Sequence, residues 1–178
     1  VWNKIYPGKV DYYYQKYNFN KMSNEELMKV INAFYAQIGN QELARQLIGK
    51  LDFEAMTDGR IASFNRANLW SYDRQMVERI YGRMQDPDYK RWEVLDFLHW
   101  GEEQGYLTDG QKKRCIPLAT EVAGIEKYAQ NAWHHMAHFH IWRGQFQEGV
   151  RALNMADKPP GTLWEIVDAY LAWGKPEQ

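Results

Sequence analysis

The sequence holds little that would crosslink the chain or anchor it in a membrane. Cys115 is the only cysteine among 178 residues, so an internal disulfide is impossible. No uninterrupted apolar run approaches the roughly 20 residues that a membrane-spanning helix needs. A chain of this length can bury a substantial core in one domain, so its stability must come from packing.

An excess of charge of either sign is missing as well. Lys and Arg total 22 and Asp and Glu total 23, which gives a formal net charge of −1. Without a global basic field, non-specific binding of nucleic acid is not expected. This balance leaves a soluble protein with specific partners as the simplest class.

Recognisable catalytic motifs are absent too. The sequence has no glycine-rich phosphate loop and no Gly-x-Ser-x-Gly nucleophile motif. Cys115 follows the basic run Lys112, Lys113 and Arg114 and carries no local nucleophile signature, so we expect an ordinary thiol on a helix. We therefore predict that the chain is not an enzyme and has no cofactor.

The start of the chain leaves its localisation open. The first residue is Val1 and not methionine, so we expect that a preceding segment was removed, such as a signal peptide or an organelle presequence. A single cysteine fits a reducing compartment, whereas a processed start fits an organellar or periplasmic protein.

Aromatic residues, by contrast, are abundant: 8 Trp, 12 Tyr and 7 Phe. Residues 1–22 contain several of them without a sustained helical period, and we predict an irregular N-terminal arm there. Tyr13, Tyr14 and Tyr17 form its aromatic centre. The arm either packs on its own domain or docks on a neighbouring chain, because aromatic side chains with a polar tip suit both environments.

Residues 23–178 show helical spacing throughout and are predicted to form a single helical domain. Ser23 and Glu26, and again Thr108 and Gln111, have the spelling of a capping box at a helix start. No segment alternates with a two-residue period, so no strand is expected. We predict an all-α fold whose helices cover residues 23–38, 43–51, two shorter stretches within 61–84, 87–104, 109–122 (with Pro117 as a kink or a late start), 125–143, 145–156 and about 164–173.

One segment, residues 131–161, resembles a known helical repeat. The residues that carry the resemblance are Trp133, Met136, Ala137, His140, Gly144, Phe146, Leu153, Ala156 and Pro160. Their order resembles the tetratricopeptide (TPR) repeat, a pair of antiparallel helices joined by a Gly-x-aromatic turn. The sequence departs from the family pattern at His140 in place of Tyr, Gly149 in place of Ala and Leu153 in place of Phe.

A fainter copy of the same pattern runs from Met28 to Leu51, with Asn32 at a position where the family has a small residue. Turns at Gly39, Gly105 and Gly144 give a repeat of roughly 33 to 39 residues if one degenerate pair lies between the first two. The resemblance implies a short α-solenoid of antiparallel helix pairs. We expect a C-terminal helix around residues 164–173 to cap it, because the outer apolar face of a terminal repeat otherwise meets water.

Four of the five histidines lie between positions 134 and 140. At helical spacing, His140 falls in one stripe with Trp133, Met136 and Ala137, the stripe that packs on the partner helix. We expect His140 at the edge of the core with one ring nitrogen hydrogen-bonded. The other three histidines lie on a different side of the same helix.

In the TPR family, partner peptides bind in a concave groove. The resemblance implies that five residues lie on or beside this groove: Asn131, His134, His135, His138 and Trp142. We therefore predict a protein–protein interaction module, an adaptor or an accessory subunit of a larger assembly, whose protein partner the sequence does not identify. Imidazole and amide groups in the groove would offer hydrogen bonds to a peptide, and the aromatic arm would be a second contact.

Two alternatives stay open. His134 and His138 are four residues apart and can reach one ion, so the chain can also be a helical metalloprotein that binds zinc or haem. That site would need a third ligand such as His99 or Glu102, and the sequence has neither HExxH nor CxxCH. The second alternative is a helical-repeat protein that binds single-stranded RNA, which the low net positive charge disfavours.

Overall fold

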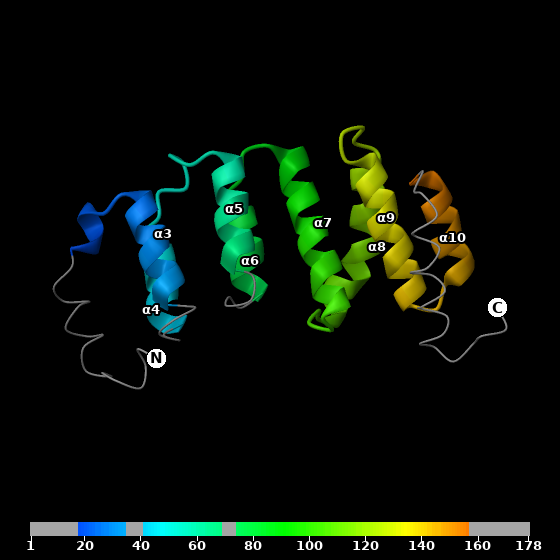
Figure 1. Ribbon diagram of the computed structural model, residues 1–178, viewed down its shortest axis with the longest axis horizontal. Helices are drawn as coiled ribbons and strands as arrows, with labels where there is room; N and C mark the ends of the chain where they lie inside the picture. Colours follow the sequence, from blue (N-terminus) through cyan, green and yellow to red (C-terminus); the bar gives the residue numbers. More distant parts are fainter. Residues whose placement is uncertain (1–17, 35–40, 69–73, 157–178) are drawn as a thin grey trace. The chain divides into compact units, whose positions relative to one another are not determined.

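In the computed structural model, the placed residues are 18–34, 41–68 and 74–156. Within these ranges the chain forms eight α-helices, one short 3-10 helix and no strand, which confirms the predicted all-α class. The helices are labelled in Figure 1. None of the helices described here combines the length and the hydrophobicity that crossing a membrane requires. The chain divides into two compact units, residues 1–85 and 86–178, and this division falls inside the single domain predicted over 23–178.

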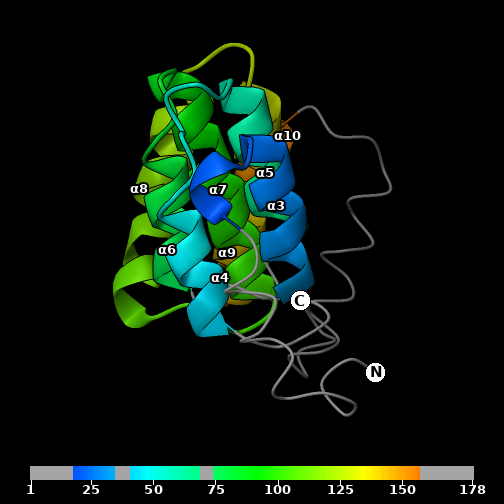
Figure 2. The same cartoon turned by 90° about the vertical axis from the view of Figure 1, so that its left-hand side faces the viewer.

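The first unit begins with a 3-10 helix and continues through four α-helices. Their bounds are η1 Phe19–Lys21, α3 Asn24–Asn32, α4 Gln41–Ile48, α5 Asp58–Asn68 and α6 Arg74–Tyr81. α3 packs against α4 and α5 packs against α6 (Figure 2). The capping box predicted at Ser23 is confirmed, because Ser23 Oγ accepts from the Glu26 amide while Glu26 Oε2 accepts from the Ser23 amide at 2.8 Å.

Aliphatic side chains from all four helices form the core of the first unit, with Ile31, Leu47, Ile61 and Ile80 each at most 2% exposed. Polar side chains tie the helices together at their ends. In one such tie, Asn24 Nδ2 donates to the Asp52 carbonyl and Asn24 Oδ1 accepts from the Asp52 amide. These bonds fix the start of α3 to the loop that follows α4.

The predicted arm over residues 1–22 is only partly described. Phe19, near its end, is buried, and Asn20 Oδ1 accepts a hydrogen bond from Lys50 Nζ at 2.7 Å. These residues therefore belong to the folded first unit. Tyr13, Tyr14 and Tyr17 lie outside the described residues.

The second unit contains α7 Pro87–Glu103, α8 Asp109–Ala123, α9 Ala129–Trp142 and α10 Phe146–Met155. Asp86 caps α7, and the predicted capping box of Thr108 and Gln111 starts α8. α8 continues through Pro117. Residues 157–178, where the C-terminal helix is predicted, lie outside the described residues.

The sequence pattern predicted a helix from Ile125, but α9 begins at Ala129. Residues 124–128 form turns instead, in which the Ile125 amide donates to the Val122 carbonyl and the Tyr128 amide donates to the Ile125 carbonyl. The apolar residues of this stretch continue the spacing of those in α9. The sequence pattern therefore did not predict a turn here.

Two glycines end the long helices α7 and α9 in the same way. Gly105 has φ 69° and Gly144 has φ 73°, a left-handed conformation that glycine adopts without strain. After each glycine, a backbone amide reaches back to the last turn: Tyr106 N–H donates to the Gly101 carbonyl and Gln145 N–H donates to the His140 carbonyl. The two turns are the same structural motif.

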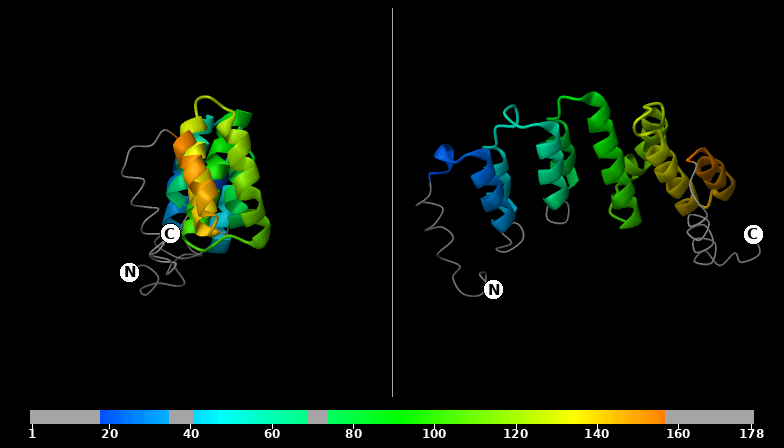
Figure 3. Two further views of the ribbon diagram at one scale, coloured as in Figure 1. Left: turned by 90° about the vertical axis from the view of Figure 1, so that its right-hand side faces the viewer. Right: turned by 45° about the horizontal axis from the view of Figure 1, so that its top comes forward.

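Within the second unit, α7 packs on α8, α8 on α9 and α9 on α10, and α7 also contacts α9 (Figure 3). The approach of α10 to α9 is close at Gly149, where an added Cβ would lie 2.7 Å from Ile141 Cγ1. A side chain at this position would therefore clash with Ile141 of α9. The α7–α9 contact brings together the side chains of the candidate site.

Candidate functional site

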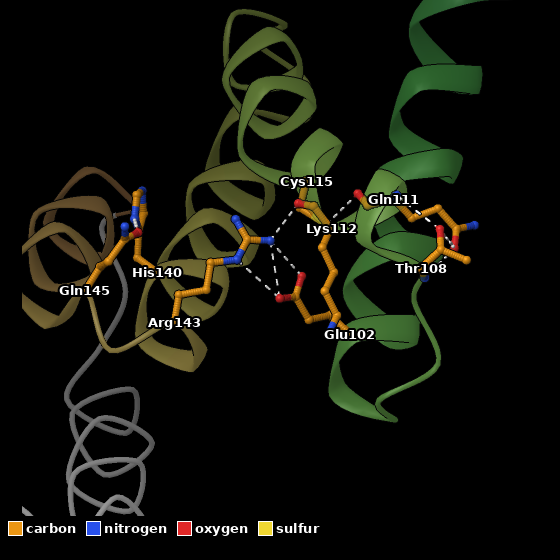
Figure 4. A network of polar contacts seen from close by, with 8 residues as sticks. All are labelled: Glu102, Thr108, Gln111, Lys112, Cys115, His140, Arg143 and Gln145. Carbon is orange, nitrogen blue, oxygen red and sulfur yellow. Dashed lines mark hydrogen bonds and ion pairs between the residues drawn. The ribbon is translucent and has the colours of Figure 1, made fainter.

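Opposite faces of α9 carry its histidines. His140 lies on the side of α10, where its Nδ1 is hydrogen-bonded to Gln145 Oε1 at 2.7 Å (Figure 4). It also lines a cleft with Trp133 and Met136 of α9 and residues of α10. The expectation of a core-edge histidine with one bonded nitrogen is therefore confirmed.

His135 and His138 lie on the other side of α9 and contact α7, and His134 packs against His138. His135 lies between two α7 side chains, with its ring centroid 5.3 Å from that of Trp92 and 4.0 Å from that of His99. Trp92 also stacks on Tyr128 at 5.5 Å and 5° between planes. Tyr128, Trp92, His135 and His99 thus form a continuous row of ring contacts between α7 and the N-terminal part of α9.

His99 and His138 join the two helices by a hydrogen bond. His99 Nε2 lies 2.9 Å from His138 Nδ1, so one of these nitrogens donates its proton to the other. His138 also packs against His134, at 4.4 Å between ring centroids, and against the Trp142 ring at 5.3 Å. We call the group of His99, His134, His135, His138, Trp92 and Trp142 the imidazole–indole cluster.

Burial changes the acid–base chemistry of the cluster. Desolvation, together with the neighbouring imidazoles of His135, His138 and His134, lowers the pKa of His99 from its usual value of 6.5 to about 2. His99 is therefore neutral at physiological pH. A neutral ring offers one donor and one acceptor nitrogen, which the bond to His138 requires.

His135 is the most enclosed histidine of the cluster. It is 8% exposed, and neither of its ring nitrogens makes a hydrogen bond within the described residues. Its Nε2 lies 3.4 Å from Asp96 Oδ1, close enough for an ion pair if the ring is protonated, but without the geometry of a hydrogen bond. His135 therefore contributes packing to the site and presents little surface to a partner.

A buried ion pair lies beside the cluster and joins three helices (Figure 4). Arg143, just after α9, donates from Nη2 to Glu102 Oε2 on α7 at 2.9 Å and to the Lys112 carbonyl on α8 at 2.8 Å. The Glu102 side chain is 8% exposed. This pair fixes the C-terminal ends of α7 and α9 relative to α8.

Cys115 is part of the same buried region. The thiol is fully buried and donates to the Gln111 carbonyl at 3.4 Å. Burial, together with the neighbouring Glu102, raises the pKa of Cys115 to about 12. Because the thiolate is the nucleophile, this cysteine is chemically inert at physiological pH, in line with the expected ordinary helix thiol.

The predicted partner-binding residues of α9 differ in exposure. Asn131 is exposed, His134, His138 and Trp142 are partly buried, and His135 is buried. Sequence reasoning considered His99 only as a third metal ligand and missed Trp92 and Asp96. A signal for His99 was present: it precedes His138 by 39 residues, the same spacing that separates Gly105 from Gly144.

The metal hypothesis gains no support from this geometry. Among the described residues, no group of three or more His, Cys, Asp or Glu side chains is arranged to hold a metal ion. His138 Nδ1 is directed at His99 Nε2, and a bond between two nitrogens occupies the lone pair that an ion would need. The arrangement favours a packed, hydrogen-bonded cluster.

Comparison with known proteins found no relative of this chain. The chain matches no protein-family model, no curated protein and no solved structure.

Proposed function

We propose that the chain is a protein–protein interaction module, an adaptor or an accessory subunit of a larger assembly, built as a short TPR-like solenoid. In this proposal, antiparallel helix pairs stack side by side, and α7 and α9 are the first helices of neighbouring pairs. The imidazole–indole cluster then lies on the side of the stack where first helices line a shared groove.

The observation that carries the proposal is the contact between His99 and His138. These residues are 39 positions apart and share a hydrogen bond, and each lies six residues before the glycine that ends its helix. Equivalent positions meet in this way when equal structural units stack next to one another. In a helical bundle without repeats, residues at equivalent positions of two helices are not expected to lie opposite each other.

The groove side offers a partner both apolar and polar contacts. Asn131 is exposed near the start of α9, and His134, His138 and Trp142 are partly exposed farther along the helix. Tryptophan provides large contact area with few rotatable bonds, and the amide and imidazole groups give directional hydrogen bonds. Such a mixture is typical of interface hot spots.

The C-terminal segment is proposed as the cap of the stack. The cleft between α9 and α10 has a volume of about 300 Å³ and is lined mostly by apolar residues, including Trp133 and Met155. Met155 is 61% exposed within the described residues. We expect removal of residues 157–178 to lower the thermal midpoint and to increase binding of a hydrophobic dye, and unchanged values would contradict the cap.

Site-specific photo-crosslinking in native cells tests the interaction proposal. A photoreactive benzoylphenylalanine replaces Asn131 beside the cluster or, as the matched control, Gln147 on α10; both positions are exposed. We expect a discrete crosslinked protein from position 131 that is absent from position 147. No product at position 131, or the same product from both positions, contradicts a binding face at the cluster.

Elemental analysis of the purified protein separates this proposal from the metalloprotein alternative. We expect no stoichiometric zinc or iron, because His99 Nε2 and His138 Nδ1 are hydrogen-bonded to each other. A bound metal at one equivalent that is lost in His138→Ala would replace the adaptor proposal by a metal-binding one.

A further inference from the structure

A cleft separate from the imidazole–indole cluster lies in the first unit, between α3 and α5. Its volume is about 200 Å³, and α3 contributes Met28, Lys29 and Asn32 while α5 contributes Arg60 and Phe64. This volume accommodates one large side chain with its flanking backbone. It is below the size of pockets that enclose nucleotides or organic cofactors, roughly 300 Å³ and above.

The floor and the rim of the cleft differ in chemistry. Met28 and Phe64 are 7% and 5% exposed and provide an apolar floor. Lys29 and Arg60 are exposed at the rim. The single acidic lining residue, Glu25, already pairs with Lys29 at 3.3 Å along their own helix, an exposed pair that contributes little. The rim therefore has a positive balance in a chain whose formal net charge is −1.

Arg60 is available for a new partner. Its backbone amide donates to Thr57 Oγ1 at the start of α5, and its guanidinium forms no bond or ion pair with the other described residues. A guanidinium presents several donors in a planar arrangement that fits a carboxylate. An acidic side chain would satisfy it without displacing an existing contact.

Asn32 provides an independent indication of a missing hydrogen-bond donor. Its Oδ1 is shielded from solvent and accepts no hydrogen bond from the described residues. Leaving a buried acceptor unpaired is unfavourable, because the loss of its hydration is not offset by a hydrogen bond. A backbone N–H from a chain that lies in the cleft is a donor of suitable type and reach.

From these contacts we infer that the cleft between α3 and α5 binds an extended acidic segment of a partner protein, whose apolar side chain lies on Met28 and Phe64. Arg60 and Lys29 pair with the carboxylates on either side of that apolar residue. Asn32 accepts a hydrogen bond from the backbone of the segment. The inference adds a second contact to the proposed interaction function and does not depend on the imidazole–indole cluster.

A library selection with the full chain tests this inference. A phage-displayed library of random octapeptides is selected on the wild-type chain and counter-selected on the double variant Lys29→Gln/Arg60→Gln. We expect the retained peptides to have Asp or Glu next to a large apolar residue. Fluorescence anisotropy then measures the affinity of a selected peptide for each variant.

The variants give separate expected losses. Lys29→Gln/Arg60→Gln should weaken binding about tenfold and reduce its dependence on salt, since two rim-exposed ion pairs are lost. Asn32→Ala should weaken binding about fivefold, the usual effect of one neutral hydrogen bond. Arg79→Gln, which removes one positive charge at an exposed position of α6 outside the cleft, should leave affinity unchanged within about twofold.

Several results overturn the inference. These are the absence of any retained peptide, retained peptides without an acidic bias, and an equal loss of affinity in Arg79→Gln. Displacement of the peptide by single-stranded RNA at the same residues would assign the cleft to nucleic acid instead. Crosslinking at position 131 does not change under any of these outcomes, so the two proposals fail separately.

Discussion

The His99 ring contacts two imidazoles of α9, those of His135 and His138, and it is enclosed by Trp142 and Phe139. In this environment a proton on His99 would lose its hydration and meet other rings that can also become charged. The lowered pKa follows from this enclosure. His99 is thus a neutral packing residue between α7 and α9.

The lowered pKa of His99 predicts how stability depends on pH. The unfolded chain binds a proton near pH 6.5 and the folded chain near pH 2, so between these values the unfolded state holds more protons. The free energy of unfolding should therefore fall as pH falls below 6.5, by up to about 1.4 kcal/mol per pH unit from this residue. Urea unfolding of wild type and His99→Phe at several pH values measures the slope.

In His99→Phe we expect a shallower slope between about pH 4 and 6, because its proton-linked component is lost. Measurement at about pH 8, where His99 is neutral in both states, isolates the effect of the substitution on packing. If the variant and the wild type have parallel profiles, His99 is not the neutral, buried group described above.

Gly149 gives a second prediction about a single position. An alanine there would place its Cβ 2.7 Å from Ile141 Cγ1 and 3.3 Å from the Ala137 carbonyl oxygen. Overpacking of this kind destabilises by about 1 to 3 kcal/mol, which exceeds the roughly 1 kcal/mol that alanine gains over glycine inside a helix. We expect Gly149→Ala to lower the free energy of unfolding.

Gly110→Ala is the matched control, because an added Cβ in α8 would have no neighbour nearer than 4.0 Å. We expect it to be neutral or stabilising by up to about 1 kcal/mol. Denaturant midpoints of the two variants measure this difference in stability. A stabilised Gly149→Ala would show that α10 can move away from α9.

Helix ends and helix contacts differ in how well the sequence predicts them. The capping boxes at Ser23 and Thr108 are confirmed, because a cap is a local arrangement of neighbouring residues. The start of α9 was predicted too early, because apolar spacing continues across the turn after Gly124. Local chemistry fixes a cap, whereas a turn between apolar residues depends on which helices they pack against.

The pair of Glu102 and Arg143 predicts how α7, α8 and α9 depend on one another. Arg143→Ala leaves the Glu102 carboxylate buried without its partner, which typically destabilises by roughly 3 to 5 kcal/mol. The double variant Glu102→Leu/Arg143→Met removes both charges and should recover most of that loss. Chemical denaturation of the two variants gives the comparison.

Arg151→Ala on α10 is the control for this pair. Arg151 pairs with Glu148 at 3.6 Å on the surface, with side chains that are 75% and 47% exposed. We expect a change below about 1 kcal/mol, since solvent screens exposed pairs. Equal losses in Arg143→Ala and Arg151→Ala would show that the Glu102 pair is screened as well.

Across the full chain, charge balance gives a prediction about nucleic acid. With 22 basic and 23 acidic residues, the chain should not be retained on single-stranded RNA at physiological ionic strength. A retention assay at several salt concentrations measures this. Retention that weakens as salt rises would favour the RNA-binding alternative over the interaction module.

The amino-acid order alone was sufficient for the all-α class, for most helix bounds of the described residues and for the separation of His140 from the other histidines. These features depend on local capping and on the 3.6-residue period, which neighbouring residues specify. The partners of His135 and His138 were not predictable in this way. Trp92 and His99 lie far from them in the chain, and only the packing of α7 on α9 brings these rings into contact.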